Sequence, residues 1–188
     1  MYFSLPFQTE TERLILRDYR PDDAELLLEI SRRNSPHWQE FESENILYNL
    51  ADLAAAKKAA AIMAEEWHAE HSYFIGLFEK SSGSFAGQLY LGVESAERLE
   101  FEAGYVADMD HEGKGYISEA LSALLDTLFA STGAAKVWIH CSDRNLRSAR
   151  VAERCGFQLV EHYPVSRHNP THGGELVYLR KRADALPE

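Results

Sequence analysis

Hydrophobic residues recur at regular spacings in the first part of the chain. The aliphatic stretch 12–17, flanked by charge, predicts a first strand. Pro21 is followed by two aspartates, which suit the positive N-terminal end of a helix. One face of this helix would be formed by Ala24, Leu27, Leu28 and Ser31. A second helix is predicted over 51–71, where apolar residues step by three and four; they are Leu53, Ala56, Ala60, Met63 and Trp67.

The middle of the chain changes to strand patterns. Two strands are predicted over 73–78 and 85–93, joined by a turn at 80–83 that contains a glycine. A further strand, 99–106, precedes a glycine-bearing loop at 110–115. The run of strands after two helices indicates that the helices pack against a sheet.

The last third of the chain alternates between the two patterns. The clearest helix has one apolar face, and Gly133 follows it as a stop signal; the face consists of Ile117, Leu121, Leu124 and Leu128. A strand at 136–141, a short helix at 145–155, a strand that begins at 156 and a final strand at 175–180 should follow. The order predicts an α/β layer with a mixed sheet, in a single domain over 1–188.

The sharpest local feature is the loop 112–116, which lies between a strand and a helix. Its glycines leave backbone N–H groups able to converge on an anion, and the helix N-terminus adds positive potential. Gly115 has no Cβ to block the approach of a phosphate. Taken alone, Gly-x-Gly before a helix also fits a plain turn, so both interpretations stay open.

Two familiar phosphate loops are excluded. A P-loop needs a glycine five positions before the Gly-Lys pair, and that position is Asp108, while Lys114 is followed by glycine rather than Ser or Thr. The dinucleotide pattern G-x-G-x-x-G fails because its third glycine position is Ser118.

A second feature is the pair Asn145 and Ser148 at the start of the short helix. Asn145 is a good N-cap, and a hydroxyl at 148 can satisfy backbone groups in the first turn. These residues have a structural interpretation as well as a functional one.

Taken together, the motifs resemble one family. They are Thr-Glu-Arg-Leu-Ile-Leu-Arg at 11–17, Glu-Ala-Gly-Tyr-Val at 102–106, Gly-Lys-Gly-Tyr-Ile-Ser-Glu-Ala at 113–120, Asn145 with Ser148, and Gly-Phe at 156–157. The chain resembles the GNAT superfamily of N-acetyltransferases, in the branch that contains the N-terminal acetyltransferases of ribosomal proteins. The resemblance extends over nearly the whole chain, and it implies a mixed, mostly antiparallel sheet that is splayed at its centre and flanked by helices.

The resemblance also implies acetyl-CoA as the acyl donor. Its pyrophosphate would lie on the N–H groups of 113–116, and its pantetheine would pair like an added strand with the backbone near Val106. The implied donor-binding residues are Tyr105, Val106, Gly113, Lys114, Gly115, Tyr116, Ile117, Asn145, Ser148 and Arg154. The family loop usually has Gln or Arg three residues before its first glycine, where this chain has Asp110, an acidic residue that could weaken phosphate binding.

The reaction needs a neutral amine and a proton for the departing thiolate. Glu102, just before the expected splay, is a candidate base acting through water, and a solvated strand carboxylate is its alternative interpretation. Ser148 matches the family position that hydrogen-bonds or protonates the thiolate. Tyr105 and Tyr116 are rival acids, although aromatic residues in such elements commonly belong to the core. Arg154 could reach the 3′-phosphate of CoA or favour a helix C-terminus.

The histidines and cysteines of the chain are weaker candidates for a metal site, a covalent nucleophile or a disulfide. His162, His168 and His172 lack a cysteine or carboxylate that would complete a regular ligand spacing, so no metal is expected. Cys155 fits a small buried residue at a helix end better than a covalent nucleophile. With Cys141 it makes only two cysteines, too few for a disulfide framework. The first ten residues show no secretory signal and no apolar run is long enough to span a bilayer, so a cytoplasmic protein is expected.

The net charge of the chain favours some classes of binding partner over others. With 19 basic and 30 acidic residues the formal charge is -11, which disfavours nucleic acid and anionic membrane and favours a cationic substrate or simple solubility. The branch resemblance implies a protein α-amine as the acceptor. A small amine such as an aminoglycoside or polyamine, and a non-catalytic acyl-CoA sensor, stay open, as does a homodimer.

Overall fold

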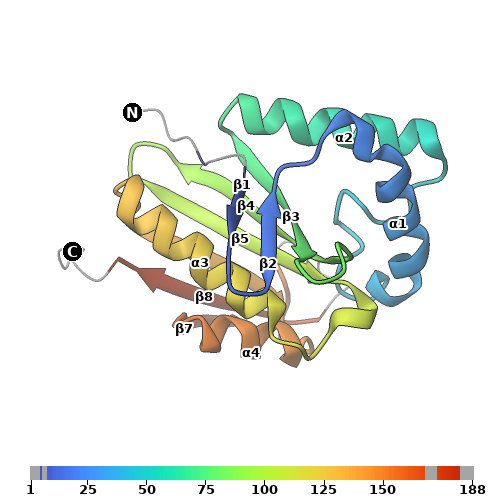
Figure 1. The fold of residues 1–188 in the computed structure, drawn as a ribbon. Coiled ribbons are helices and arrows are strands. Elements are labelled where there is room, and N and C mark those ends of the chain that lie inside the picture. Colours follow the sequence, from blue (N-terminus) through green and yellow to red (C-terminus); the bar gives the residue numbers. More distant parts are fainter. Residues whose placement is uncertain (1–4, 6–7, 168–172, 183–188) are drawn as a thin grey trace. The chain divides into compact units, whose positions relative to one another are not determined.

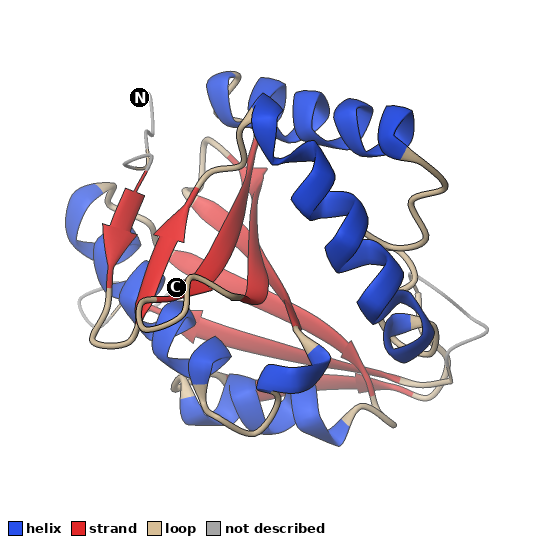
Figure 2. Ribbon diagram, turned by 45° about the vertical axis from the view of Figure 1, so that its right-hand side comes forward, coloured by secondary structure: helices blue, strands red, loops and turns tan. Residues whose placement is uncertain are grey.

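The structure is a computed structural model that describes residues 5, 8–167 and 173–182. The hydrogen-bonded strands of the sheet follow the order β1-β2-β3-β4-β5-β6-β8-β7. Figure 1 labels the elements, and Figure 2 shows strands in red and helices in blue. The strands are β1 Gln8–Glu10, β2 Leu14–Arg17, β3 Ser72–Glu79, β4 Phe85–Ser95, β5 Glu100–Ala107, β6 Lys136–Ser142, β7 Gln158–Tyr163 and β8 Glu175–Lys181. The helices are α1 Ala24–Trp38, α2 Leu53–His68, α3 Tyr116–Ser131 and α4 Leu146–Arg154, with short 3-10 turns η1 Pro21–Asp23 and η2 Met109–His111.

The strand directions confirm a mixed, mostly antiparallel sheet. β1 with β2, β2 with β3, β6 with β8, and β7 with β8 are antiparallel, whereas β5 and β6 run parallel. A parallel neighbour requires a crossover, and the chain between β5 and β6 makes it through α3.

Residue contacts divide the chain into two compact units. The first consists of Met1–Tyr90 and Tyr105–Ala120, and the second of Leu91–Gly104 and Leu121–Glu188. β4, β5 and α3 contribute residues to both units. The expectation of a single domain over 1–188 therefore stays a prediction.

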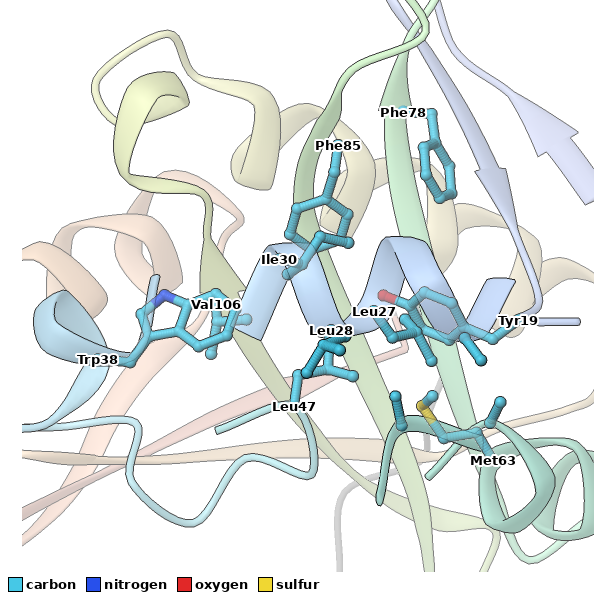
Figure 3. Packing of buried hydrophobic residues seen from close by; sticks show 13 residues of the cluster. Tyr19, Leu27, Leu28, Ile30, Trp38, Leu47, Met63, Phe78, Phe85 and Val106 are labelled. Atoms are coloured by element: carbon cyan, nitrogen blue, oxygen red, sulfur yellow. The ribbon is translucent and has the colours of Figure 1, made fainter. Parts of the chain in front are cut away.

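The first unit has its core under α1 and α2, two helices that contact each other (Figure 1). The face predicted for α1 is buried, and the predicted stripe of α2 is buried except for the half-exposed Leu53. The side chain of Asp52 caps α2 by accepting a hydrogen bond from the N–H of Ala55 at 2.9 Å. Figure 3 shows the resulting cluster, whose largest members include Tyr19, Leu27, Trp38, Met63 and Phe85.

In the second unit, α4 covers one face of the strand pair β6–β8. Along β6, Val137 and Ile139 are buried, and their partners on β8 are Arg180 and Tyr178. Tyr178 donates to Glu153 Oε1 at 3.3 Å, and Arg180 Nη1 donates to the carbonyl of Cys155 at 2.6 Å. Helix α4 therefore lies on this face.

One prediction about the N-terminal region needs correction, and one strand there was missed. The first strand begins at Leu14 rather than at residue 12, because Thr11 donates its N–H to the carbonyl of Leu14 at 2.9 Å and so forms a turn. A strand before this turn, β1, was not predicted, since its three residues are too few to show a period.

Within the described part of the chain, no helix is both apolar and long enough to span a bilayer.

Candidate functional site

The glycine loop of the first unit lies between η2 and α3. Gly113 and Gly115 have φ values of 75° and 79°, in the left-handed region that favours glycine. A Cβ at Gly115 would contact only Arg13 Nη2, at 3.6 Å, so the backbone conformation rather than crowding requires glycine here. The N–H of Glu119 donates to the carbonyl of Gly115 at 3.0 Å, and the N–H groups before Glu119 thus precede the helical ladder of α3.

Asp108 anchors the segment that enters this loop. Its carboxylate is fully buried and accepts hydrogen bonds from Arg33 Nη2 at 2.5 Å and from Asn34 Nδ2 at 2.9 Å. His111 Nδ1 lies 2.9 Å from its other oxygen, and Asn34 Oδ1 accepts the N–H of Met109 at 2.8 Å. Burial alone would raise the pKa of Asp108, but the bonds from His111, Asn34 and Arg33 outweigh it and hold this pKa below its usual range.

Helix α1 makes two further contacts with the same segment. Trp38 Nε1 donates to the carbonyl of Ala107 at 2.9 Å, and His37 Nε2 lies 2.7 Å from Glu112 Oε1. The four α1 residues in these contacts share one helix face, as spacings of three and four allow; they are Arg33, Asn34, His37 and Trp38. One face of α1 thus fixes the backbone from 107 to 112.

The other side of the loop is tied to the N-terminal turn through Glu119. Thr11 Oγ1 donates to Glu119 Oε1 at 2.5 Å, and Arg13 Nε donates to Glu119 Oε2 at 2.6 Å. Arg13 also donates from Nη1 to the carbonyl of Lys114 at 3.0 Å, and its guanidinium lies 4.6 Å from the ring centre of Tyr116. These contacts place the cation of Arg13 beside the loop, near the exposed Lys114.

Tyr116 and Ile117 point their side chains inward. Tyr116 is buried, and its hydroxyl donates a short hydrogen bond to Glu79 Oε1. Hydrogen bonds from Ser82 and then Tyr116 lower the pKa of Glu79 to about 2. The Tyr116 hydroxyl is therefore engaged with a carboxylate, which argues against its role as a rival acid, and only its N–H and that of Ile117 could serve a ligand on the loop.

Glu102 in the second unit lies where the pairing of β5 with β6 ends. The register runs from Glu100 opposite Lys136 to Glu102 opposite Trp138, although both strands continue. Glu102 is half-buried and alternates with the buried Phe101 and Ala103. Its side chain consequently lies on the face of the strand pair opposite to α4.

Asn145 and Ser148 begin α4, as predicted. The buried side chain of Asn145 caps the helix by accepting the N–H of Ser148 at 3.1 Å. The hydroxyl of Ser148 is hydrogen-bonded to the thiol of Cys141 at the end of β6. Burial raises the pKa of Cys141 to about 11, against a smaller lowering by Ser148, so the neighbour of this hydroxyl is a neutral thiol.

A histidine–carboxylate pair in the second unit was not predicted. His140 Nδ1 on β6 lies 2.7 Å from Glu175 Oε1 at the start of β8, and Glu175 is only 2% exposed. The other oxygen of Glu175 accepts hydrogen bonds from Ser166 Oγ at 3.1 Å and from the N–H of Arg167 at 2.8 Å. The two partners are 35 residues apart, and only the antiparallel pairing of β6 with β8 shows that they meet.

The remaining candidates lie at the ends of elements. Cys155 is buried at the C-cap of α4, as predicted, and the exposed Arg154 occupies the last turn of that helix. His162 Nε2 lies 3.3 Å from Asp143 Oδ2, while His168 and His172 fall outside the described residues. Among the residues that the structure describes, no cluster suitable for a metal ion is found.

The predicted site residues are divided between the two units. Tyr105, Val106 and the loop 113–117 belong to the first unit, and the other candidates, Glu102, Asn145, Ser148 and Arg154, belong to the second. The contacts that hold the glycine loop, those of Asp108 and Glu119, were not visible in the sequence, because each joins residues far apart along the chain. Asp110, in η2, donates its N–H to Asp108 Oδ1 at 3.1 Å, and the effect of its own carboxylate stays a prediction.

Comparison with known proteins places this architecture in one family. "Probable N-acetyltransferase YjcK" of Bacillus subtilis (strain 168) is 25% identical over 146 residues, which cover 77% of this chain and 80% of that protein. The ribosomal-protein-S5-alanine acetyltransferase of Vibrio fischeri has a similar structure, with a TM-score of 0.83 and 17% identity over 97% of this chain and 100% of that one. The structure of the microcin C7 self-immunity acetyltransferase MccE, in complex with acetyl-CoA and AMP, is also similar. Its TM-score is 0.82 and its sequence identity 17%, over 90% of this chain and 93% of that one.

The match to a family model is the strongest of these findings. The acetyltransferase (GNAT) domain model matches residues 13–158, which include the glycine loop, Glu102 and Ser148. The chain therefore belongs to the GNAT family of acetyltransferases.

Proposed function

We propose that this chain transfers the acetyl group of acetyl-CoA to a primary amine, and that the amine is the N-terminal α-amine of a protein. The observation that carries the proposal is the glycine loop at the start of α3, with Arg13 and Lys114 beside it. Acetyl-CoA is bound in the MccE structure, and the name of the Vibrio fischeri enzyme gives a ribosomal protein as its acceptor.

The loop has the chemistry that a pyrophosphate requires. Its two left-handed glycines and the first turn of α3 present backbone N–H donors, and the helix N-terminus adds positive potential. Lys114 and Arg13 supply full positive charges at the same place. The buried side chains of Tyr116 and Ile117 turn away from a ligand on the loop, so the proposed contacts of these two residues are made by the backbone.

The end of the β5–β6 pairing supports the expected place of pantetheine. The β5–β6 register ends at Glu102 and Trp138, and an extended chain that adds to β5 beyond this point would hydrogen-bond to its backbone toward Val106. The thioester at the tip of that chain would then lie close to the level of Glu102 along β5.

Glu102 and Ser148 have suitable positions for opposite ends of the transfer. Glu102 lies on the face of β5–β6 that points away from α4, and Ser148 begins α4 on the other side. Glu102 would take a proton from the ammonium group through water, and the neutral amine would attack the thioester carbonyl. As the C–S bond breaks, Ser148 would donate a hydrogen bond or proton to the CoA thiolate, and the amide and free CoA would leave.

A small amine is the alternative acceptor. The net charge of -11 favours any cationic substrate, whether a polyamine or a peptide N-terminus. A chain that binds acetyl-CoA without turnover would instead be a sensor.

The three alternatives are separated by one assay. Purified protein is mixed with acetyl-CoA and with either a short peptide that begins with alanine, spermidine, or an aminoglycoside, and the release of free thiol is followed. Release that depends on the peptide, together with an acetylated peptide N-terminus in mass spectrometry, supports the proposal. Release with the small amines alone identifies a small-amine enzyme. Binding of acetyl-CoA without release above the no-protein rate would indicate a sensor and contradict the proposal.

A further inference from the structure

The His140–Glu175 pair has a fixed orientation of its imidazole ring. Oε2 of Glu175 accepts from Ser166 Oγ and from the N–H of Arg167, so this carboxylate is surrounded by donors and acts as an acceptor. Its other oxygen faces His140 Nδ1 at 2.7 Å, and the proton of that contact therefore belongs to Nδ1. With the proton held there, Nε2 is the basic nitrogen of a neutral ring.

The ring lies on the same face of the sheet as Glu102. Glu102 is opposite Trp138 on β6, and His140 is two residues farther along that strand, so the two side chains point to the same side. Strand spacing and rise per residue place their Cα atoms about 8 Å or more apart, so a proton that moves between the two side chains would travel through water. His140 is thus the first titratable group of β6 beyond the end of the pairing, on the side away from α4.

The charged residues around His140 can balance a positive ring. The strand residues of the second unit that are charged or titratable and share this face are Glu100, Glu102, Lys136, Glu161, Tyr163, Glu175 and Lys181. Arg167, beside them, donates to Tyr163 at 3.0 Å and through its N–H to Glu175. Lys136 is engaged with Glu100 at 3.3 Å. The buried carboxylate of Glu175 directly balances an imidazolium, because its charge is within hydrogen-bond distance of the ring.

We propose that His140, oriented by Glu175, is the relay that receives the acceptor's proton from Glu102. This inference rests on the proposed function. The ammonium of the acceptor loses its proton to Glu102 through water, Glu102 passes the proton to Nε2 of His140, and the imidazolium releases it to solvent. Glu102 returns to its carboxylate form, and no oxidant or further reactant is needed. An imidazole suits this role because its neutral Nε2 accepts a proton and the imidazolium can release it again to water.

The test compares His140→Asn with Glu102→Gln and with the double variant. The side-chain amide that His140→Asn introduces can still donate to Glu175, but it has no titratable nitrogen. Kinetics are measured from pH 5 to pH 9 with acetyl-CoA and two acceptor probes, the alanine peptide and spermidine. His162→Asn is the matched control, because His162 also lies beside a carboxylate in this unit, 3.3 Å from Asp143, but is more exposed.

We expect His140→Asn to lower kcat by about 10²-fold while KM for acetyl-CoA stays within about twofold. The acidic limb of the pH–rate profile of His140→Asn should differ from that of the wild type. The kcat of the double variant should lie within about threefold of the kcat of the slower single variant, because both residues serve one proton path. Imidazole in the buffer should restore part of the rate to His140→Ala, which a purely structural role for the ring would not allow.

The outcomes separate the relay from the reaction itself. If His140→Asn keeps kcat within about twofold of the wild type, or if the rate losses of the two single variants multiply in the double variant, the relay is wrong and transfer by other groups stands. Loss of folding in His140→Asn would leave the imidazole rescue of His140→Ala and the kinetics of His140→Gln to decide. If the wild-type protein itself releases no thiol with either probe, the proposed function fails, and the relay fails with it.

Discussion

The buried carboxylate of Asp108 collects more hydrogen bonds than the sequence would suggest for a residue before a turn. Arg33 and Asn34 reach it from α1, and His111 and the N–H of Asp110 reach it from η2. A buried charge is tolerated only when it is paired and hydrogen-bonded, and here the partners also hold the entrance to the glycine loop. Asp108 is in this sense a positioning residue.

Asp108→Asn should lower the free energy of unfolding by roughly 2–4 kcal/mol at pH 7, because it leaves Arg33 without its buried counter-charge and weakens the hydrogen bond to His111. Urea denaturation measures this difference. Asp110→Asn is the control, since that side chain is exposed and two residues away. A loss in Asp108→Asn no larger than in Asp110→Asn would show that the hydrogen bonds of Asp108 stabilise little.

The stability difference between the wild type and Asp108→Asn should also depend on pH. Folding lowers the pKa of Asp108 below its ordinary value of 3.8, so its carboxylate contributes stability that is complete above this value. The contribution is lost as the pH falls through the folded pKa. The difference between wild type and Asp108→Asn should therefore be constant near neutral pH and shrink in acid, and a difference that grows in acid would contradict the assignment.

Ser148 is the second residue with a separable role. Protonating or hydrogen-bonding the thiolate matters mainly as the C–S bond breaks, so Ser148→Ala should lower kcat by about 10²–10⁴-fold with a smaller effect on acetyl-CoA affinity. Its backbone N–H keeps the cap to Asn145 in the variant, which preserves α4. Ser131→Ala, at the exposed end of α3, is the control. Near-normal kcat in Ser148→Ala would transfer the role to another acid or leave the thiolate to depart unaided.

At the scale of elements, the start of α3 depends on a short N-terminal turn. Thr11 and Arg13 both bind Glu119 in the first turns of α3, and Arg13 extends to the carbonyl of Lys114. The turn at the start of the motif 11–17 therefore holds the N-terminus of α3, where the anion would bind.

Arg13→Gln should weaken acetyl-CoA binding by about 3- to 10-fold, since a half-exposed cation beside phosphates is partly screened by salt. The difference from wild type should shrink at high ionic strength, and titration calorimetry at two salt concentrations measures it. Lys57→Gln is the control, because Lys57 is an exposed cation of the first unit that lies on α2, away from the N-terminal turn. Equal losses in both variants would indicate a general charge effect instead of a local one.

Elements with a clear period were predicted well. The buried faces of α1 and α2 appear where the spacing placed them, and Asn145 caps α4 as its position suggested. β1 and the turns at 11–13 and 109–111 were not predicted, because short segments carry no period and are stabilised by distant partners. Local pattern determines these helices, whereas contacts across the fold determine the turns.

The candidate site divides in the same way. The glycine loop and Ser148 could be found from motifs, since their residue types occur at a fixed spacing along the chain. Glu119 with Arg13, Asp108 with α1, and His140 with Glu175 could not, because each pair depends on which strands and helices become neighbours. The sequence marks groups that would touch a ligand more clearly than the groups that hold them.

At the scale of the whole molecule, binding of the donor should be visible in the stability of the fold. A ligand that binds only the native state raises the stability of the fold it occupies, by about 2.7 kcal/mol at a hundred times its dissociation constant. The account therefore predicts that acetyl-CoA protects the protein against thermal unfolding.

Thermal unfolding with saturating acetyl-CoA, in wild type and in two glycine variants, tests the central claim most directly. Gly115→Glu adds bulk and negative charge at the loop, and Gly133→Glu makes the same change at the other end of α3, at a glycine with a similar φ of 75°. We predict that acetyl-CoA raises the Tm of wild type and of Gly133→Glu by roughly 5–10 °C and leaves that of Gly115→Glu unchanged. Equal rises in wild type and Gly115→Glu would contradict the claim that the glycine loop binds the pyrophosphate of acetyl-CoA.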